Sequence, residues 1–459
     1  MAPTVRSFSA EFEPLALIER HPERYPGWLE SSAPPGAAGR EPDAVARFDV
    51  LPIGTGECLR LDADRRLSGP YSAGAGGFLE ALDAWWRSLP PPAAGSPPPF
   101  GGGWLLYLGY ELAAEVEPRL DLPRSPDPWI ALAWRTPAAW VRERGSGRAW
   151  VVAEPGHEGL IEEFSAHARA AAAAPGPGPG PVEPTLEVRE EPPERFLDAV
   201  DRALAHIAAG DVYQANLSRG WTAQAPGPVD PVGLYRRLRT ANPAPFSALL
   251  RDGDFAIVSS SPERLVSIRA GRVATRPIAG TRPRGTTAAR DAELIASLLD
   301  NEKERAEHVM LIDLERNDLG RVCAGGSVRV DEYMTVESYA HVHHIVSNVS
   351  GRLRAGVTPV QVIRALFPGG TITGCPKVRC MQIIAELEAA GRGAYTGSIG
   401  YLDRAGGLDL NILIRTITAR GAALGFRAGA GIVADSVPAQ ELAETRAKAE
   451  GLLRAVGPP

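Results

Sequence analysis

The sequence predicts an α+β fold in which antiparallel sheets are flanked by helices. The first observation is a set of segments whose apolar residues recur every three or four positions, as on one face of a helix. The second is a set of short segments with strand-like alternation, many of them joined by glycine-containing turns. Helices combined with turn-connected strands favour the α+β class with much antiparallel sheet.

The first 165 residues are predicted to form a mixed α/β unit. Residues 46–54 (ARFDVLPIG) and 149–155 (AWVVAEP) alternate as strands do, whereas 76–89 (GGFLEALDAWWRSL) have helical spacing. Residues 100–113 (FGGGWLLYLGYELA) form a glycine-rich turn that leads into an apolar segment.

The later part of the chain gives clearer signals. An amphipathic helix is predicted from residue 193, closed by Gly210 and followed by a strand up to residue 221. The remaining predicted helical regions are 288–322, 359–370, 376–393 and 439–457, and the predicted strand regions are 255–281, 396–403, 408–420 and 424–436.

Composition excludes several classes of protein. The chain has 459 residues and a net charge of −6, so nothing general attracts it to nucleic acid or to an anionic membrane. It has neither an apolar N-terminal segment of signal-peptide type nor an apolar run long enough to span a bilayer. Its four cysteines show no CxxC spacing, which favours reduced thiols and a cytoplasmic location.

An alanine-rich and Gly-Pro-rich segment divides the chain. Proline lacks an amide donor and glycine is entropically loose, so this segment is predicted to be a linker. The predicted division is an N-terminal region over 1–165, a linker over 166–190 and a catalytic domain over 191–459. A surface loop within one domain is the alternative for the linker.

Two helices each offer a pair of carboxylates. Glu304 and Glu307 lie three residues apart, and Glu441 and Glu444 repeat this spacing, with Lys448 one turn further on. Two such pairs could hold Mg²⁺, which prefers a few carboxylate oxygens and keeps its other positions for water or a substrate anion. Either pair alone is more commonly a solvated helix face.

Several glycine-rich segments carry cations and indicate a pocket for a small dianion. PGGTITGCPKVR opens a helix at Pro376, with Lys377 and Arg379 in its first turn. Arg415 stands in an otherwise apolar strand, where an arginine usually meets a carboxylate. Ordinary turn chemistry is the alternative explanation for the glycines.

Acid–base groups complete the candidate site. Glu263 follows a strand and is a candidate general acid, and one of the histidines in AHVHHIVSNV is a candidate acid, base or anion partner. The residues by themselves therefore predict a Mg²⁺-dependent enzyme for a small anionic substrate. A non-catalytic ligand-binding protein is the alternative.

Ten segments in the second part resemble the chorismate-utilising enzymes, a family that includes anthranilate synthase component I, aminodeoxychorismate synthase component I, and the isochorismate and salicylate synthases. The segments are GDVYQANLSR, SSSPERLV, RPIAGTRPRG, KERAEHVMLIDLERNDLGRV, VHHIVSNVSG, GCPKVRCMQIIAELE, YTGSIGYLD, ILIRT, GAGIVADS and ELAETRAKAE. They follow the order of the family and cover most of 191–455. The resemblance implies the fold of anthranilate synthase component I.

The resemblance also implies individual roles. Glu307 and Glu444 correspond to Mg²⁺ ligands, supported by Glu304 and Glu441, and the ion would hold the ring carboxylate of chorismate. The implied positions around the substrate are Ala279, Gly280, Tyr395, Arg415, Gly429 and Lys448. The implied catalytic positions are Gln214, Thr281 in the segment facing the ring, and Glu263 and His344 as acid–base groups around the leaving C4 hydroxyl.

Position 214 bears on the choice of nucleophile. Isochorismate and salicylate synthases resemble this chain but carry a lysine there that activates water, and Gln214 cannot act as a base. The resemblance therefore implies ammonia as the nucleophile. The chain lacks glutaminase motifs, so ammonia is expected from a separate glutamine amidotransferase subunit.

Two ammonia-using reactions remain open. The segments YQANLS, SPERL, VHH and YTGSIGYL resemble aminodeoxychorismate synthase component I, which converts chorismate to 4-amino-4-deoxychorismate for 4-aminobenzoate and folate synthesis. Ala279 is instead typical of anthranilate synthase component I, which forms anthranilate and pyruvate; many aminodeoxychorismate synthases have a lysine there. The first reaction is predicted, with the second as the alternative. The motif WLESSAP (28–34) resembles the family's inhibitor pocket, with tryptophan as a candidate ligand.

Overall fold

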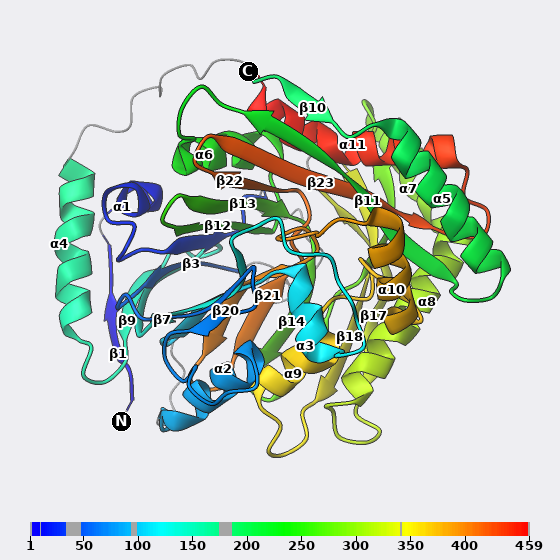
Figure 1. Cartoon of the computed structure of the whole chain (residues 1–459). Helices are drawn as coiled ribbons and strands as arrows, with labels where there is room; N and C mark the ends of the chain where they lie inside the picture. The colour runs from blue at the N-terminus through cyan, green and yellow to red at the C-terminus, as the bar shows by residue number, and fades with distance from the viewer. Residues whose placement is uncertain are drawn as a thin grey trace.

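A computed structural model describes residues 2–9, 11–33, 47–92, 99–173, 186–339 and 342–457. Two large antiparallel sheets occupy the centre of the molecule and helices lie around them (Figure 1). The predicted α+β class, with antiparallel sheets flanked by helices, is confirmed.

The first sheet has twelve strands within the described residues. In spatial order they are β1 (Thr4–Ser7), β9 (Ala149–Ala153), β8 (Ala138–Glu143), β3 (Phe48–Ile53), β2 (Gly27–Glu30), β12 (Phe246–Asp252), β13 (Phe255–Ser261), β22 (Thr416–Arg420), β23 (Ala423–Ile432), β11 (Gln214–Gln224) and β10 (Val188–Glu190), with β19 (Gly374–Cys375) paired to β11.

The second sheet has eleven strands in the same described part of the chain. In spatial order they are β16 (Ile278–Pro283), β18 (Val342–Arg352), β15 (Arg272–Thr275), β14 (Arg264–Arg269), β21 (Leu408–Asn411), β20 (Ser398–Asp403), β6 (Gly103–Leu108), β7 (Trp129–Thr136), β4 (Cys58–Asp62) and β5 (Leu67–Ser68), with β17 (Arg329–Ser338) paired to β18.

The helices cover the outer faces of these sheets. Apolar side chains of the first sheet pack with α1 (Pro14–Arg20), α4 (Gly159–Ala173), α6 (Pro231–Ala241) and α11 (Pro438–Val456). Those of the second sheet pack with α2 (Phe78–Ser88), α9 (Pro359–Leu366) and part of α8 (Glu302–Gly320). The other helices are α3 (Ala113–Val116), preceded by the short 3₁₀ turn η1 (Tyr110–Leu112), α5 (Pro193–Ala208), α7 (Ala288–Asp300) and α10 (Lys377–Glu388).

The regions before and after the predicted linker share both sheets. Strand β2 pairs with β12 in the first sheet, and β6 pairs with β20 in the second. A further apolar core lies between the sheets, where Leu105 and Trp134 join Leu250 and Ile257. The two regions are therefore not separate bodies in space.

The predicted linker boundaries need correction at both ends. Residues 166–173 belong to α4, because Ala168 is one of the side chains that this helix buries. Residues 188–190 form β10 and pair with β11. The remaining linker residues 174–185 lie outside the described part of the chain.

The predicted helical region over 288–322 is two helices rather than one. Helix α7 ends at Asp300, and the Asn301 side chain accepts the backbone N–H of Glu304 at 3.0 Å as the N-cap of α8. Asparagine favours this position because its side chain satisfies a free amide at the helix start. The cap places Glu304 and Glu307 in the first two turns of α8.

The predicted strand over 408–420 is also interrupted. It forms β21 and β22, and Arg415 lies between them with a φ of 52°. A non-glycine residue with positive φ is uncommon and is found where the surrounding structure imposes it, often at functional sites. The pattern of apolar residues alone gave no sign of this break.

Candidate active site

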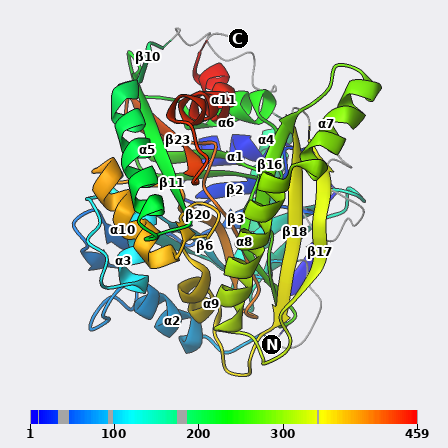
Figure 2. The same cartoon turned by 90° about the vertical axis from the view of Figure 1, so that its right-hand side faces the viewer.

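The predicted site residues gather where four strands meet two helices. Helix α8 packs on β16 and β18, and α11 packs on β23, the neighbour of β11. In Figure 2, α8 and β16 lie opposite β11, with α11 above them. Both sheets therefore contribute to one site.

Helix α8 contributes two carboxylates to this site. Glu307 Oε1 accepts a hydrogen bond from Gln214 Nε2 at 2.8 Å. Burial raises the pKa of Glu307, and the nearby carboxylates of Glu444 and Glu304 contribute to the rise. Glu304 Oε1 accepts from Arg282 Nη1 at 2.6 Å, whereas its Oε2 is buried and has no partner among the described residues.

Helix α11 connects its carboxylates to β23. Glu444 pairs with Lys448, one turn away, at 2.6 Å. The same Lys448 Nζ donates to the carbonyl of Gly429 at 2.9 Å, which fixes the helix against the strand. Glu441 lies one turn before Glu444 on this helix.

These carboxylates do not form a preassembled metal site. In the part of the chain that the structure describes, no group of three or more histidine, cysteine, aspartate or glutamate side chains is arranged to hold an ion. The donor set nevertheless fits a hard cation, because Glu304 Oε2 is buried with no partner in the described ranges and Glu307 lies beside two other carboxylates. A cation here would compete with Lys448 for Glu444.

Glu263 follows β13 and is fully enclosed. Its Oε1 atom has no hydrogen-bond partner within the described residues. Burial raises the pKa of Glu263 to about 7, even though Arg415 acts in the opposite direction. A carboxyl group that is half protonated near neutral pH is suited to general acid catalysis.

His344 and Thr281 face each other across the β16–β18 pair. Their strand register is direct, and His344 Nδ1 lies 2.9 Å from Thr281 Oγ1. Burial lowers the pKa of His344 to about 4, and the positive charge of Arg415 adds to this effect. The imidazole is therefore neutral at neutral pH and can accept a proton.

Ala279 and Gly280 lie in β16 rather than in an open loop. Ala279 is buried opposite Ile345 of β18, and the register shifts between Ala279 and Thr281. Gly280 occupies this bulge with a φ of 68°, and a Cβ there would lie 2.7 Å from Glu304 Oε2. The bulge brings the backbone close to α8 and leaves only a methyl group at position 279.

Arg415, with Tyr395 and Gly429 near it, forms the part of the site that can bind an anion. The Arg415 side chain makes no hydrogen bond or ion pair with any residue that the structure describes, and burial lowers its pKa. Its electrostatic neighbours include Tyr395, Glu263 and Glu444. A Cβ on Gly429 would lie 2.6 Å from the Tyr395 hydroxyl, so glycine is needed there. This arrangement can accept an anion beside Arg415.

Four other cations of the predicted anion pocket are already paired. Arg282 binds Glu304 and Arg284 binds Asp291. Lys377 binds Asp318 and Arg379 binds Asp211. These four cations are therefore already neutralised by carboxylates that lie between 7 and 168 positions away in the sequence, so the predicted anion pocket does not have them as free charges.

Two further polar residues, not predicted from the sequence, belong to the site. The buried atoms Asn216 Oδ1 and Thr371 Oγ1 have no partner among the described residues. Asn216 lies two residues after Gln214 on β11, so both side chains project from one face of the strand. That spacing was a usable signal, whereas Thr371 lies in the loop 367–373 and only the fold places it beside Glu263.

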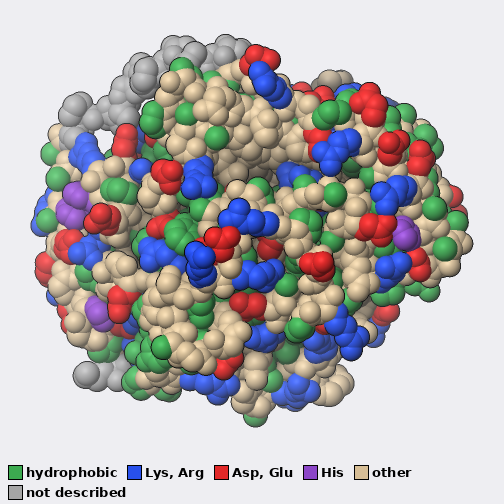
Figure 3. Space-filling model, viewed as in Figure 1, with side chains coloured by type: hydrophobic (Ala, Val, Ile, Leu, Met, Phe, Trp, Pro, Cys, Tyr) green, Lys and Arg blue, Asp and Glu red, His purple; other side chains and the backbone are tan. Residues whose placement is uncertain are grey.

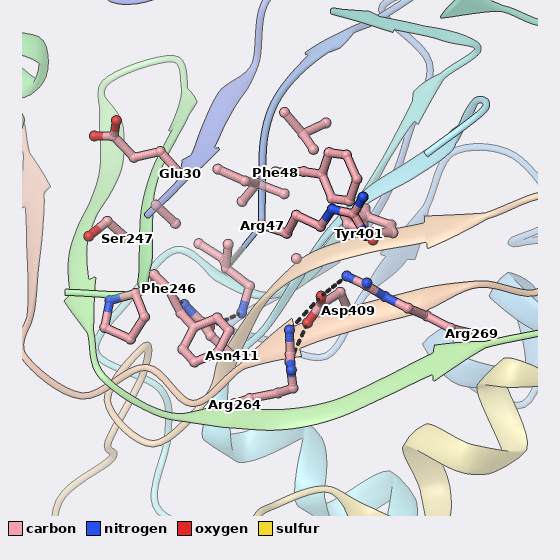
Figure 4. A pocket seen from close by; sticks show the side chains of 16 residues that line it. Glu30, Arg47, Phe48, Phe246, Ser247, Arg264, Arg269, Tyr401, Asp409 and Asn411 are labelled. Carbon is pink, nitrogen blue, oxygen red and sulfur yellow. Dashed lines mark hydrogen bonds and ion pairs between the residues drawn. The ribbon is translucent and has the colours of Figure 1, made fainter. Parts of the chain in front are cut away.

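A separate pocket is lined in part by Leu29 and Glu30 of the WLESSAP segment (Figure 4). Its cavity volume is about 60 Å³, and Figure 4 shows Glu30, Phe246 and Arg264 among its lining residues. Arg264 Nε donates to Asp409 Oδ1 at 2.9 Å. We call this pocket the N-terminal pocket. Pro34 of the WLESSAP motif lies outside the described residues.

On the face of the molecule that Figure 3 shows, no large patch of side chains carries charge of a single sign. Acidic and basic side chains are interspersed there, without a continuous basic stripe (Figure 3). Among the helices of the described ranges, none has the length and apolar character needed to cross a membrane.

Comparison with known proteins shows the family of the chain. The sequence pattern of the chorismate binding enzymes matches residues 70–454. A Synechocystis protein named anthranilate synthase component I-like protein is 44% identical over 359 residues, covering 78% of this chain and 73% of the relative. Aminodeoxychorismate synthase component 1 of Bacillus subtilis is 42% identical over 394 residues, covering 82% of each chain.

A solved structure supports the same conclusion. Anthranilate synthase component I from Streptococcus pneumoniae superposes with a TM-score of 0.79 at 32% identity, covering 89% of this chain and 92% of the other. With a family pattern that spans most of the sequence, and relatives that are more than 40% identical over most of its length, the protein belongs to the chorismate binding enzymes.

Proposed function

We propose that the protein is an aminodeoxychorismate synthase component I, which joins ammonia to chorismate and releases water to give 4-amino-4-deoxychorismate. The observation that supports ammonia as the nucleophile is the hydrogen bonding of the Gln214 side chain. Its Nε2 donates to Glu307, while its buried Oε1 has no partner among the described residues. An ammonia molecule has the N–H donors that this oxygen lacks.

Gln214 also argues against water as the nucleophile. Water needs a base to become reactive at neutral pH, and an amide side chain cannot take a proton in that range. Ammonia is nucleophilic as it stands and needs only to be held in place. Asn216 Oδ1, on the same face of β11, offers a second acceptor without a partner in the described chain.

The carboxylates of α8 and α11 would hold the metal. We assign Glu307 and Glu444 as ligands of Mg²⁺, with Glu304 and Glu441 in support. When bound, Mg²⁺ would supply positive charge to bind a substrate carboxylate and to offset the negative charge around it. The buried Glu304 Oε2 and the crowding of Glu307 by other carboxylates support this assignment.

The protein's own residues would carry out binding and proton transfer. Arg415, the Tyr395 hydroxyl and Lys448 would bind a carboxylate of chorismate beside the backbone of Gly429. Protonated Glu263 would give its proton to the departing C4 hydroxyl, which leaves as water when the C–O bond breaks. As the C–N bond forms, neutral His344 can accept the excess proton from nitrogen.

The position of the new nitrogen distinguishes the two candidate functions. The 42% identity to aminodeoxychorismate synthase component 1 of Bacillus subtilis, over 82% of both chains, supports the first. Ala279 favours anthranilate synthase component I, as does the name of the Synechocystis relative. In the first reaction Ala279 would mean that ammonia reacts without a covalent lysine adduct.

We further propose that a glutamine amidotransferase subunit supplies the ammonia and that the protein works in the cytoplasm. The component I names of the relatives support a second subunit. The four cysteines are free in the structure, as a reducing compartment would keep them. We also propose tryptophan as the ligand of the N-terminal pocket, where Phe246 offers an aromatic wall.

Product identification tests this proposal. The purified chain is incubated with chorismate, Mg²⁺ and ammonium at mildly alkaline pH, and the products are separated by mass-resolved chromatography. We expect a product that keeps the enolpyruvyl group and yields 4-aminobenzoate only after a lyase is added. Removal of Mg²⁺ by a chelator should stop turnover.

Other outcomes are equally informative. Formation of 2-aminobenzoate with pyruvate would replace the first candidate by anthranilate synthase. An isochorismate product would contradict the assignment of ammonia as nucleophile. Tryptophan should raise the midpoint of thermal unfolding if it fills the N-terminal pocket, and an unchanged midpoint would contradict that assignment.

A further inference from the structure

The segment that carries Tyr395 is held by two buried carboxylates from the N-terminal region. The N–H of Arg392 donates to Glu111 Oε1 at 2.7 Å, and the N–H of Gly393 lies 3.2 Å from both Glu111 oxygens. The next N–H, of Ala394, donates to Asp127 Oδ2 at 2.7 Å. Three successive amides before Tyr395 are thus bound by carboxylates more than 260 residues away in sequence.

The backbone of this segment is unusual at several points. Gly393 has a φ of 58°, and a Cβ there would lie 2.2 Å from Asp127 Oδ2. Thr396 also has a positive φ, of 63°, and its N–H donates to the carbonyl of Leu413 at 2.8 Å. Such conformations persist only where the surroundings impose them. Glu111 and Asp127 supply that restraint from one side.

The N-terminal region also reaches the ring of Tyr395 through an arginine. The Arg392 guanidinium lies 4.9 Å from the ring centre of Tyr110 and 5.6 Å from that of Tyr395. The N–H of Tyr110 donates to the carbonyl of Gly393 at 2.8 Å. The position of the Tyr395 hydroxyl, beside Gly429, therefore depends on how this segment is held.

We propose that Glu111 and Asp127 are positioning residues for Tyr395, which fix its hydroxyl toward the substrate carboxylate. The proposal rests on the proposed function, because it takes Tyr395 as a substrate contact. Both carboxylates are buried, and burial raises the pKa of Glu111 and brings that of Asp127 to about 7. Burying two such groups is costly unless they are well hydrogen-bonded, as they are here.

The test compares two variants at one position. Glu111→Met removes both acceptors at similar volume, and Glu111→Gln keeps Oε1 as an acceptor. With chorismate, Mg²⁺ and ammonium, we expect Glu111→Met to raise the KM for chorismate about tenfold while kcat changes less. Glu111→Gln should raise the KM by a smaller factor. Equal effects of the two variants would overturn the proposal.

Repeating Glu111→Met in a Tyr395→Phe protein distinguishes positioning of the Tyr395 hydroxyl from general support of the fold. In Tyr395→Phe, which lacks the hydroxyl, Glu111→Met should have little further effect on KM, because its effect acts through that hydroxyl. If the double variant raises KM by the product of the two single factors, the two substitutions act independently. Glu111 then only supports folding and the proposal is wrong. If Tyr395→Phe alone leaves KM unchanged, the substrate contact in the proposed function fails instead.

Gly393→Ala keeps the proposal testable if Glu111→Met does not fold. The added methyl group would push the segment away from Asp127, and circular dichroism reports whether the fold survives. A folded Gly393→Ala protein should show the same selective rise in KM. A folded variant with the KM of the parent protein would overturn the proposal.

Discussion

Two buried clusters of polar side chains lie on either side of Tyr395, and they differ in how they are paired. In the first, the paired cluster, Glu388 binds Arg392 at 2.6 Å and Arg427 at 3.1 Å, and it accepts from Ser218. In the second, the open cluster, Glu263 and Gln214 each keep an oxygen without a partner in the described chain, and Arg415 makes no ion pair there.

The two glutamates show what this difference means. Burial acts to raise the pKa of Glu388, yet Arg392 and Arg427 hold it below its ordinary value. Burial raises the pKa of Glu263 to about 7, because nothing comparable compensates its charge. Full pairing indicates a structural role, whereas buried polar groups that lie close together without partners indicate a site for a ligand.

The largest expected effect is on turnover when the open cluster loses its acid. Glu263→Gln should lower kcat about 1000-fold, because the departing hydroxyl then has no proton donor. Stability at neutral pH should not fall, since the amide removes a charge that burial disfavours. Single-turnover formation of aminodeoxychorismate and thermal unfolding measure these effects. A kcat within tenfold of the parent protein would contradict the role of Glu263.

The next prediction compares one arginine from each cluster. Arg415→Met should raise the KM for chorismate about 100-fold and leave the free energy of unfolding almost unchanged, because no ion pair is lost. Arg392→Met, the matched change in the paired cluster, should lower the free energy of unfolding by about 3 kcal/mol, because Glu388 loses a partner. Urea unfolding and steady-state kinetics measure both. A large loss of stability in Arg415→Met would contradict the distinction between the clusters.

The smallest expected effect is on the pH profile. The folded protein holds Glu263 with a raised pKa of about 7, so the protonated acid is available below that pH and is lost above it. At a fixed concentration of unprotonated ammonia, kcat should fall about tenfold for each pH unit above about 7. A profile that stays flat across this range would show that another group supplies the proton.

Some of the site could be predicted because its spacing is local. Glu304 with Glu307, and Glu441 with Glu444, lie on single helices, and a three-residue spacing places each pair on one face whatever the rest of the fold does. Glu263 was a candidate general acid from its place after a strand, whereas His344 was singled out through resemblance to a family. The structure brings both within electrostatic reach of Arg415.

Other features depend on contacts that no local pattern encodes. Lys377 was predicted to be one of the cations of an anion pocket, but the fold places Asp318 beside it. The positive φ of Arg415 arises at a break between β21 and β22 that continuous apolar residues conceal. Thr371 and Glu111 reach the site only because distant segments pack against it. Contacts of this kind join segments that are not neighbours in the sequence, so sequence periodicity carries no information about them.

Both halves of the chain contribute strands to each sheet, and this limits which deletions the gene can tolerate. A gene that lost the first 190 codons would leave β12 without β2 and β20 without β6, so each sheet would end in a new, unprotected edge. Such edges recruit other chains and lead to aggregation. The N-terminal region therefore cannot be deleted without opening an edge in both sheets.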